Sequence, residues 1–277
     1  AHDLAKAGKK VVLVEAQRIG WGASGRNGGF VSPGYALGYE GISARVGPVA
    51  AHELFRMSVE GMQIVADNIR DLGISAANPC AGILGAVRYD AGRGLADHRD
   101  WLAKEFNYEV AHLDRAALAE HLTSPRYHQA LHDQNAFHFD PLAYCLGLAR
   151  AATAEGALIY EATPADKIEG ALGGWTVTTP KGRISAREVV VTTGGYTDRL
   201  VPELHRAFLP IATYVMISRE ARDLIASAIH TRSAIGDDRR AGDYYRLVDG
   251  GKRVLWGGKI TTRTTEPRDL GKRLHQT

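Results

Sequence analysis

The sequence contains few cysteines and no long apolar run. Only two cysteines, Cys80 and Cys145, occur in 277 residues, and they lie too far apart to form a CxxC pair. We therefore expect neither a disulfide framework nor a zinc site, and we expect a reducing, cytoplasmic location. No apolar run approaches the roughly 20 residues that a membrane-spanning helix needs, and no signal peptide is visible, so we expect no membrane span.

An excess of charge of one sign is also missing. The chain has 34 lysines and arginines against 31 acidic residues, a net charge of +3, and it has no lysine-arginine block. Nucleic acid is therefore not the implied partner. His128, His132 and His138 match no metal-ligand spacing, and HExxH is absent because Gln129 follows His128, so we expect no metal.

Glycine, in contrast, is concentrated in residues 19–29, which read IGWGASGRNGG and hold five glycines. This stretch follows residues 11–16, which read as a buried strand with Glu15 at its carboxyl end. Glycines let the backbone approach a large ligand, and backbone amides donate hydrogen bonds to phosphate. The alternative is an ordinary glycine-rich surface loop.

Glu15-Ala16 and the loop after them resemble the second FAD-binding segment of the D-amino-acid oxidase-like flavoproteins. Within that family they are most similar to members such as gamma-glutamylputrescine oxidase. The similarity continues, in the family's order, through residues 140–142, 161–164, 189–196 and 243–247. It therefore spans nearly the whole chain, although the later segments are individually weak.

The resemblance implies FAD as the cofactor and assigns residues to it. These candidate FAD-binding residues are Glu15, Ala16, Gly22, Ala23, Ser24, Gly25, Arg26, Asn27, Gly28, Gly29, Ala165, Thr193 and Gly194. A carboxylate at position 15 can accept hydrogen bonds from the ribose hydroxyls, although an exposed strand-end acid is the alternative. Arg26 faces either the pyrophosphate or the carbonyls of its own loop. Thr193 and Gly194 otherwise form a plain turn from strand to helix.

The implied fold class is α/β, with two interleaved domains. Residues 1–39 and 140–207 are expected to form a Rossmann-like FAD-binding domain. Residues 40–139 and 208–277 are expected to form an α+β substrate domain with an antiparallel sheet. Apolar spacings of three and four predict a helix over residues 47–72. Strands are predicted over residues 184–191 and 208–217, and a hairpin over residues 244–258.

Both ends of the sequence depart from the family's pattern. Residues 1–8 read as the end of a helix, so the first strand and the GxGxxG turn of a dinucleotide-binding unit are not in the sequence. Residues 274–277 carry no closing glycine-rich segment. The expectation is a truncated chain of an FAD-dependent oxidase or dehydrogenase that is itself inactive, and one alternative function is that of a non-catalytic piece that cannot hold FAD.

The activity implied by the resemblance is oxidation of an amine or amino acid at the carbon beside nitrogen. Hydride passes to the flavin, the imine is hydrolysed, and oxygen or another acceptor takes the electrons. The substrate-side candidates are Tyr214, Tyr244, Tyr245 and Arg246, because tyrosines give an aromatic wall with a donor and arginine can pair a carboxylate. Packing is the alternative role for each of them. If Arg246 binds a substrate carboxylate, it favours an amino acid or a gamma-glutamyl amine as the substrate.

Other reactions fit the sequence less well. A D-amino acid or a hydroxy acid is the alternative substrate within the family, and a glycerol-phosphate dehydrogenase would keep FAD. The early loop's likeness to the amine-oxidising members argues against the hydroxy-acid and glycerol-phosphate readings. The hypothesis of a pyridine-nucleotide dehydrogenase gives no role to the glycine-rich residues 22–29.

Overall fold

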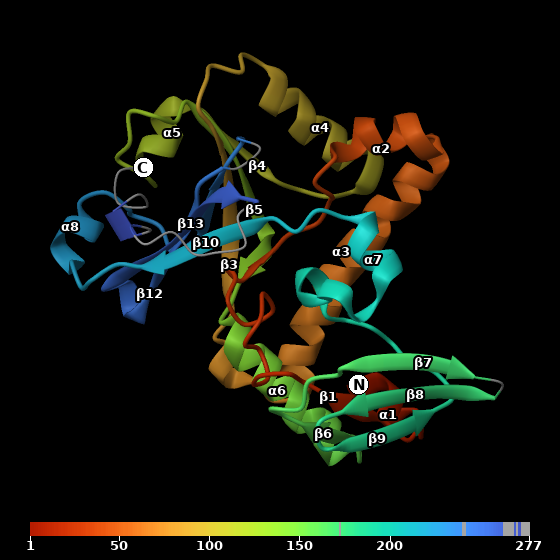
Figure 1. Ribbon diagram of the computed structural model, residues 1–277. Coiled ribbons are helices and arrows are strands. Elements are labelled where there is room, and N and C mark those ends of the chain that lie inside the picture. The colour runs from red at the N-terminus through yellow and green to blue at the C-terminus, as the bar shows by residue number, and fades with distance from the viewer. Residues whose placement is uncertain (172, 240–241, 263–268, 270, 273–277) are drawn as a thin grey trace. The chain divides into compact units, whose positions relative to one another are not determined.

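The computed structural model describes residues 1–171, 173–239, 242–262, 269 and 271–272. Residues 274–277, which carry no closing glycine-rich segment in the sequence, lie outside the described residues. The chain forms two compact units, each built from separated stretches (Figure 1). Unit 1 comprises Ala1–Arg26, Pro141–Thr213 and Ile260–Leu270, and unit 2 comprises Asn27–Asp140, Tyr214–Lys259 and Gly271–Thr277. The functional roles predicted for two interleaved domains stay a prediction.

Unit 1 contains a parallel strand pair flanked by helices. Strand β1 (Val12–Val14) pairs with β6 (Leu158–Tyr160), and α1 (His2–Lys6) contacts α6 (Pro141–Ala154). Three buried alanines, Ala5, Ala152 and Ala157, form the small core between them. Alanine has no side chain beyond Cβ, so helices and strands can approach closely. The antiparallel strands of the second sheet in unit 1 are β7 (Lys167–Ala171), β8 (Gly174–Thr179) and β9 (Gly182–Ala186).

The strand predicted over residues 184–191 ends early, at Ala186. Residues 187–193 belong to no strand, and the Val190 side chain is 72% exposed. An apolar run forms a strand only when a neighbouring strand satisfies its backbone groups, and no described strand pairs with this one. The elements that follow are η2 (Gly194–Tyr196), η3 (Asp198–Leu200) and α7 (Pro202–Ala207).

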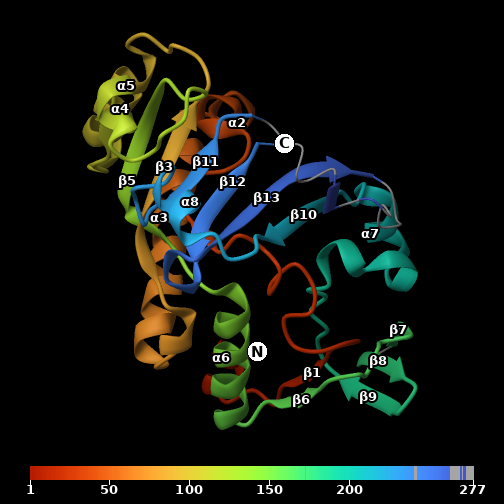
Figure 2. The same ribbon diagram turned by 90° about the vertical axis from the view of Figure 1, so that its left-hand side faces the viewer.

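Unit 2 is built on a large sheet, whose strands run in the order β10-β13-β12-β11-β3-β5-β2, with β4 also paired to β5 (Figure 2). The strands are β2 (Phe30–Val31), β3 (Cys80–Val87), β4 (Ala111–Leu113), β5 (Gln129–His138), β10 (Ala212–Ile217), β11 (Ala234–Asp237), β12 (Tyr244–Val248) and β13 (Arg253–Thr261). The predicted hairpin is confirmed as β12 and β13, joined by η4 (Asp249–Gly251).

The expected antiparallel sheet is in fact mixed. Strand β11 runs parallel to β3, with Ile235 opposite Leu84, whereas the other registered pairs in this sheet are antiparallel. Parallel neighbours need a long crossover connection, and here the chain passes through β4, β5 and unit 1 before it returns as β11. Such a return leaves no local signal in the sequence.

One face of the unit 2 sheet carries the main apolar core. Leu84, Ala130 and Ile235 are completely buried there. Leu118 and Leu122 pack against the same cluster from the segment around α5 (Arg115–Ala119). Burial of each leucine or isoleucine side chain contributes roughly 1.5–3 kcal/mol, so this face anchors the sheet.

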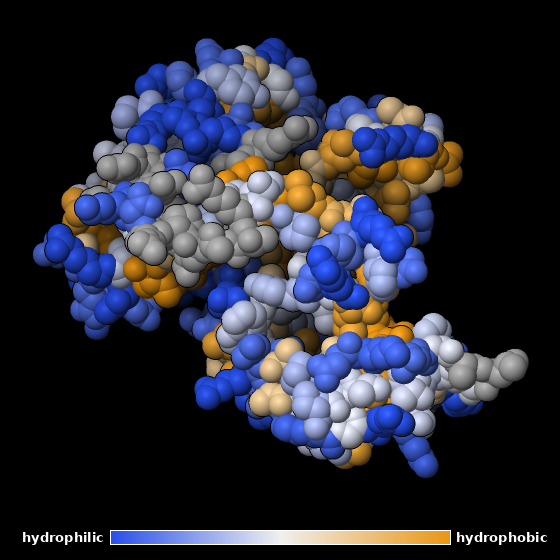
Figure 3. All heavy atoms as spheres, in the orientation of Figure 1, coloured by the Kyte–Doolittle hydropathy of each residue, from blue (hydrophilic) through white to orange (hydrophobic). Residues whose placement is uncertain are grey.

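The other helices of unit 2 are α2 (Gly38–Val46), α3 (Pro48–Asp71), η1 (Ser75–Ala77), α4 (Gly94–Phe106) and α8 (Arg222–Ala226). The helix predicted over residues 47–72 is confirmed as α3. Pro48 opens it, because a missing N–H costs nothing in the first turn. Apolar side chains also lie on the outer surface where α2 meets α3 (Figure 3), and Val46 and Val49 are 52% and 84% exposed there.

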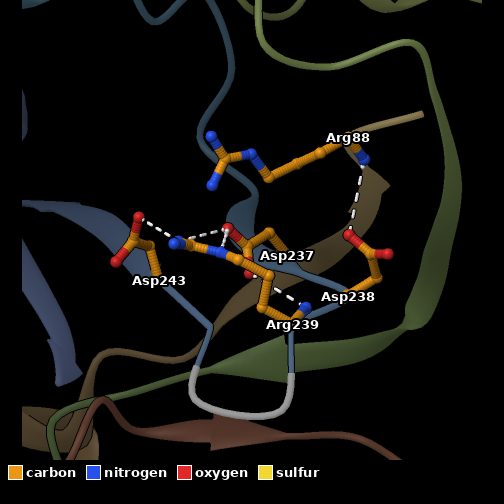
Figure 4. A network of polar contacts seen from close by, with 5 residues as sticks. All are labelled: Arg88, Asp237, Asp238, Arg239 and Asp243. Carbon is orange, nitrogen blue, oxygen red and sulfur yellow. Dashed lines mark hydrogen bonds and ion pairs between the residues drawn. The ribbon is translucent and has the colours of Figure 1, made fainter. Parts of the chain in front are cut away.

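A polar network closes the turn between β11 and β12 (Figure 4). Nε of Arg239 donates to Oδ2 of Asp237 at 2.9 Å, and its Nη2 pairs with both Asp237 and Asp243. Only 1% of the Asp237 side chain is exposed. A side chain at Gly242 would overlap Oδ1 of Asp237, so glycine permits this close turn. The acidic partners hold the pKa of Arg239 above its usual range, chiefly through the bond to Asp237.

We expect Asp237→Asn to lower the free energy of unfolding by about 1–3 kcal/mol, because it removes the charge from a buried hydrogen-bonded pair. Asp238→Asn is the matched control. Asp238 is exposed and accepts one bond, from the Arg88 amide at 3.4 Å, so its substitution is expected to cost less than about 0.5 kcal/mol. Urea unfolding followed by tryptophan fluorescence measures both, and equal losses would contradict the role of the network.

Candidate functional site

The glycine-rich loop of unit 1 folds tightly onto itself and onto α6. A Cβ atom at Gly25 would overlap the carbonyl oxygen of Gly20, and one at Gly20 would lie 2.7 Å from Cδ1 of Leu142. Gly20 has a φ of +75°, which also favours glycine. The glycines at positions 20 and 25 are therefore required by the loop itself, whatever ligand it binds.

Tyr196 joins this loop to the second predicted FAD segment. Its hydroxyl accepts a hydrogen bond from Nη2 of Arg26 at 3.2 Å, and its ring meets the Trp21 ring at a centroid distance of 5.6 Å. The Arg26 guanidinium lies 4.5 Å from the centroid of the Trp21 ring. Because Tyr196 is in η2 beside Thr193 and Gly194, these contacts bring residues 21–26 and 193–196 together. No role was predicted for Trp21 or Tyr196 from the sequence.

The second segment is held in place by its own hydroxyls. Oγ1 of Thr193 lies 2.6 Å from Oγ1 of Thr197, which donates to the carbonyl oxygen of Gly194 at 2.7 Å. Gly194 has a φ of +53°, and a Cβ built there would meet no atom within 4 Å. Space beside the Gly194 backbone is therefore open.

The loop surface suits a large anionic ligand. Ala23 and Ser24 are exposed and small, so the backbone there is approachable. The exposed Arg26 side chain adds a positive charge on the same loop. These features fit the pyrophosphate of the FAD that the sequence implies.

Glu15 lies at the carboxyl end of β1, as predicted, and Ala16 follows it on the surface. Oε1 of Glu15 accepts a hydrogen bond from the amide of Gln17 at 2.8 Å, and its carbonyl accepts one from the amide of Thr163 at 2.9 Å. The second contact places Glu15 near the segment that leads to half-buried Ala165. This arrangement fits a carboxylate at the edge of a nucleotide site.

Glu161 ties the same two segments together and was not singled out from the sequence. Its Oε1 accepts a hydrogen bond from the amide of Ile19 at 2.6 Å. The acid precedes a turn with a positive φ at Ala162, which is uncommon for alanine. The available sequence signal for its role was its place in residues 161–164, one of the segments that resemble the family.

The last three predicted loop residues, Asn27, Gly28 and Gly29, belong to unit 2. Oδ1 of Asn27 accepts a hydrogen bond from the Gly29 amide at 2.7 Å, and both glycines are buried. A Cβ at Gly28 would lie 2.7 Å from the Tyr244 ring. Within unit 2 these glycines allow close packing rather than an open surface.

Arg246 secures this packed segment. Its Nε donates to the carbonyl oxygen of Gly28 at 2.7 Å, and its Nη2 donates to that of Phe139 at 2.9 Å. The residue is 8% exposed, and burial lowers the pKa of its guanidinium. The carbonyl dipoles partly replace lost water, so the charge has polar partners in the interior.

The four substrate-side candidates do not all face the same way. Tyr244 and Arg246 lie two residues apart on β12 and share one face of the sheet, whereas Tyr245 points to the other face. Tyr245 packs on the apolar core, and burial raises the pKa of its hydroxyl. Tyr214 is half-buried on β10, at the end of the strand order. The structure therefore brings Tyr244 and Arg246 together.

Two of the histidines considered from the sequence are buried in β5. Nε2 of His138 donates to the carbonyl of Arg232 at 2.9 Å, while its buried Nδ1 has no hydrogen-bond partner among the residues that the structure describes. His132 lies 2.9 Å from the Ser233 hydroxyl. Among the described residues, no three histidine, cysteine or acidic side chains are grouped so that they could hold a metal ion. None of the helices in the described ranges has the length and apolar character needed to cross a membrane.

Comparison with known proteins gives consistent matches. A family model described as FAD dependent oxidoreductase matches residues 1–275. The probable oxidoreductase OrdL of Haemophilus influenzae is 32% identical over 93% of this chain and 61% of its own length. The gamma-glutamylputrescine oxidoreductase of Escherichia coli is 32% identical over 98% of this chain and 63% of its own length. The chain thus spans about three fifths of these two relatives.

The fold also matches solved structures. Glycine oxidase from Bacillus cereus ATCC 14579 superimposes with a TM-score of 0.69, at 22% identity, over 99% of this chain and 72% of its own length. This likeness shows a shared mixed α/β fold.

The buried histidines predict a pH dependence of stability. Burial is the largest cause that lowers the pKa of His138 and of His132. The unfolded chain, with histidine pKa values near 6.5, therefore binds more protons than the folded chain below about pH 7. The free energy of unfolding is expected to fall as pH is lowered through this window, by up to about 1.4 kcal/mol per pH unit for each proton.

His138→Gln is expected to flatten this slope, because glutamine can still donate to the Arg232 carbonyl but does not titrate. His98→Gln, at an exposed position on α4, is the control and should leave the slope unchanged. Urea unfolding at several pH values from 5 to 8 measures it. A steeper or unaltered slope in His138→Gln would refute the assignment.

Proposed function

This chain belongs to the FAD dependent oxidoreductase family, and from that membership we propose that it acts in the FAD-dependent oxidation of an amine or amino acid. The observation that carries the proposal is the contact of Arg26 with Trp21 and Tyr196, because it assembles two small-residue segments into one surface. That surface has open backbone and a positive charge, which fit the cofactor of the family.

We assign the cofactor contacts residue by residue. Arg26 and the backbone of residues 22–25 would bind the pyrophosphate, and Thr193 with Gly194 would line the cofactor. Glu15 would accept bonds from ribose hydroxyls through the carboxylate oxygen that the Gln17 amide leaves unused. Ala16 and Ala165 would flank the adenosine. Asn27, Gly28 and Gly29 would continue the cofactor-binding loop by shaping its packed end.

The chemistry that FAD supplies when bound is acceptance of a hydride from the substrate carbon beside nitrogen. The amine nitrogen must be neutral for that loss, and a desolvated site favours the neutral form. The nitrogen also loses a proton, so the substrate becomes an imine, which water hydrolyses to a carbonyl compound. Oxygen or another acceptor then takes the two electrons. The protein's task is to bind the amine, orient it and exclude water.

The proposed substrate is a gamma-glutamylputrescine-like amine. The name of the Escherichia coli relative supports this choice, as does Arg246, a guanidinium suited to a carboxylate on the Tyr244 face. Tyr214, Tyr244 and Tyr245 are proposed as aromatic substrate-side residues. Because Arg246 already bonds two carbonyls, we propose that it holds the Gly28 segment and that a carboxylate would meet its remaining N–H groups.

Binding of FAD is the first test. Titration of the chain with FAD, followed by flavin fluorescence, is expected to show saturable binding. Arg26→Ala is expected to weaken it about tenfold or more, the effect of losing a charge-assisted bond to phosphate. Arg18→Ala, at an exposed position before the same loop, is the control and should bind as the unaltered chain does. A chain that does not bind FAD would favour the alternative of a non-catalytic piece.

Reduction of the bound flavin tests the substrate. Anaerobic addition of gamma-glutamylputrescine is expected to bleach the visible absorption faster than putrescine, which lacks the carboxylate, or simple D-amino acids do. Faster bleaching by a D-amino acid would show that a D-amino acid, and not gamma-glutamylputrescine, is the preferred substrate. If none of these compounds bleaches the flavin, amine oxidation by this chain is refuted. A hydroxy acid is included to test the remaining alternative in the family.

A further inference from the structure

Unit 2 contains a cavity of about 360 Å³ that none of the assignments above uses. Its walls come from α2, α3 and α4, from the sheet strands β3 and β5, and from the segments 32–35 and 108–110. Small-molecule sites typically measure about 300–1,000 Å³, so this volume suits a small ligand. Every lining residue belongs to unit 2.

Aromatic side chains are prominent in the walls. Tyr39, Phe55, Trp101 and Tyr108 line the cavity. The ring centroids of Tyr39 and Trp101 are 4.8 Å apart, and Phe106 lies 4.1 Å from Phe55 and 5.1 Å from Trp101. These mutual contacts restrict the ring positions before any ligand binds.

The charges that line the cavity are of one sign. Glu40 and Asp133 are the acidic lining residues, and no lysine or arginine is among the described residues that form the walls. His98 is the remaining titratable group with a basic side chain there, and it stacks on Trp101 at 5.4 Å. The cavity therefore favours a positively charged ligand.

Asp133 is fixed in place by three donors. Its Oδ1 accepts hydrogen bonds from the amides of Asn135 at 2.9 Å and Ala136 at 3.1 Å, and its Oδ2 accepts one from the Tyr108 hydroxyl at 2.7 Å. Burial, followed by the bond to Asp133, raises the pKa of Tyr108, so the hydroxyl keeps its proton and remains a donor. A carboxylate anchored in this way is preorganised for a cation.

The floor of the cavity continues the sheet face that bears Tyr244. Gly85 lines the cavity and pairs with Gly236, which in turn pairs with Tyr244. Partners in register project to the same side of a sheet. A Cβ at Gly236 would meet no atom within 4 Å, and at Gly85 only the Leu131 carbonyl at 3.9 Å, so this face is open between Tyr244 and the cavity.

We propose that this cavity binds the ammonium group of a short aliphatic amine, with Glu40 and Asp133 as its counter-charges and the aromatic rings around its stem. Cations bind favourably over aromatic faces, and desolvation by the ring walls strengthens the pairing with carboxylates. The apolar lining at Ile42, Ile83 and Leu131 suits methylene groups. This binding goes beyond the proposed oxidation, because it needs no FAD.

Trp101 lines the cavity, so its fluorescence reports ligand binding directly. The chain without added FAD is titrated with n-butylamine and putrescine, and with 1-butanol as a neutral molecule of matched length, while tryptophan fluorescence is recorded. We expect a saturable change with both amines and a change at least about tenfold weaker in affinity with 1-butanol, the cost of losing a charged hydrogen bond. In Trp101→Phe the signal is expected to disappear, although Trp21, Trp175 and Trp256 remain.

Charge-removing variants locate the site. Glu40→Gln and Asp133→Asn are each expected to weaken amine binding about tenfold, whereas Glu60→Gln, on the exposed side of α3, should not change it. Glu40 is exposed, so its variant keeps the test valid if Asp133→Asn fails to fold. Equal affinity for 1-butanol, a signal that survives Trp101→Phe, or undiminished binding in Glu40→Gln would each overturn the proposal. Failure of flavin bleaching alone would leave it standing.

Discussion

Close approach of backbone to neighbouring groups is the constraint on which both units depend. In unit 1, the loop after β1 closes because Gly25 has no side chain to strike the Gly20 carbonyl. In unit 2, the Tyr244 ring lies where side chains at Gly28 and Gly257 would stand. Any larger residue at these three positions would force the surrounding segments apart, at a cost of typically 1–3 kcal/mol or more. The shape of each candidate site follows from these contacts.

A buried charge enforces the same geometry in unit 2. The Arg246 guanidinium donates hydrogen bonds to two main-chain carbonyls, those of Gly28 and Phe139. An incompletely solvated cation holds such acceptors firmly, because losing one would leave a donor unsatisfied in the interior. The position of residues 28 and 139 is therefore coupled to strand β12, from which Arg246 and Tyr244 project together.

Local patterns in the sequence predicted the elements whose causes are local. The spacing of apolar residues before Gly73 was sufficient for α3, and the turn at residues 249–251 was sufficient for the β12–β13 hairpin. The glycine-rich loop was also recognisable. Strand β11 could not be placed parallel to β3, because that pairing depends on where a long connection returns. Residues 189–191 look like a strand but find no partner among the described strands.

The candidate site, too, depends on contacts between residues that are distant in sequence, and local patterns do not reveal such contacts. Arg26 was visible as the large cation of the loop, but Tyr196 gained its role only through contacts across 170 positions of the chain. Adjacent tyrosines were considered together, although the two-residue period of a strand separates them: Tyr244 and Tyr245 face opposite sides of the sheet. If the two-residue period of a strand is applied to the sequence, it already places Tyr244 and Tyr245 on opposite faces. The cavity beside Trp101 assembles helices and strands that no single motif connects.

The interleaving of the two units also has a consequence for synthesis on the ribosome. Strand β1 pairs with β6, so Val12 can pair with Leu158 only after all of β2 to β5 has been translated. Until then the nascent segment that contains α1, β1 and the glycine-rich loop remains without its strand partner. Closure of so long a loop is entropically slow, and exposed strand edges associate with other chains. Unit 1 is therefore a part of this protein whose yield should depend on translation speed and on chaperones.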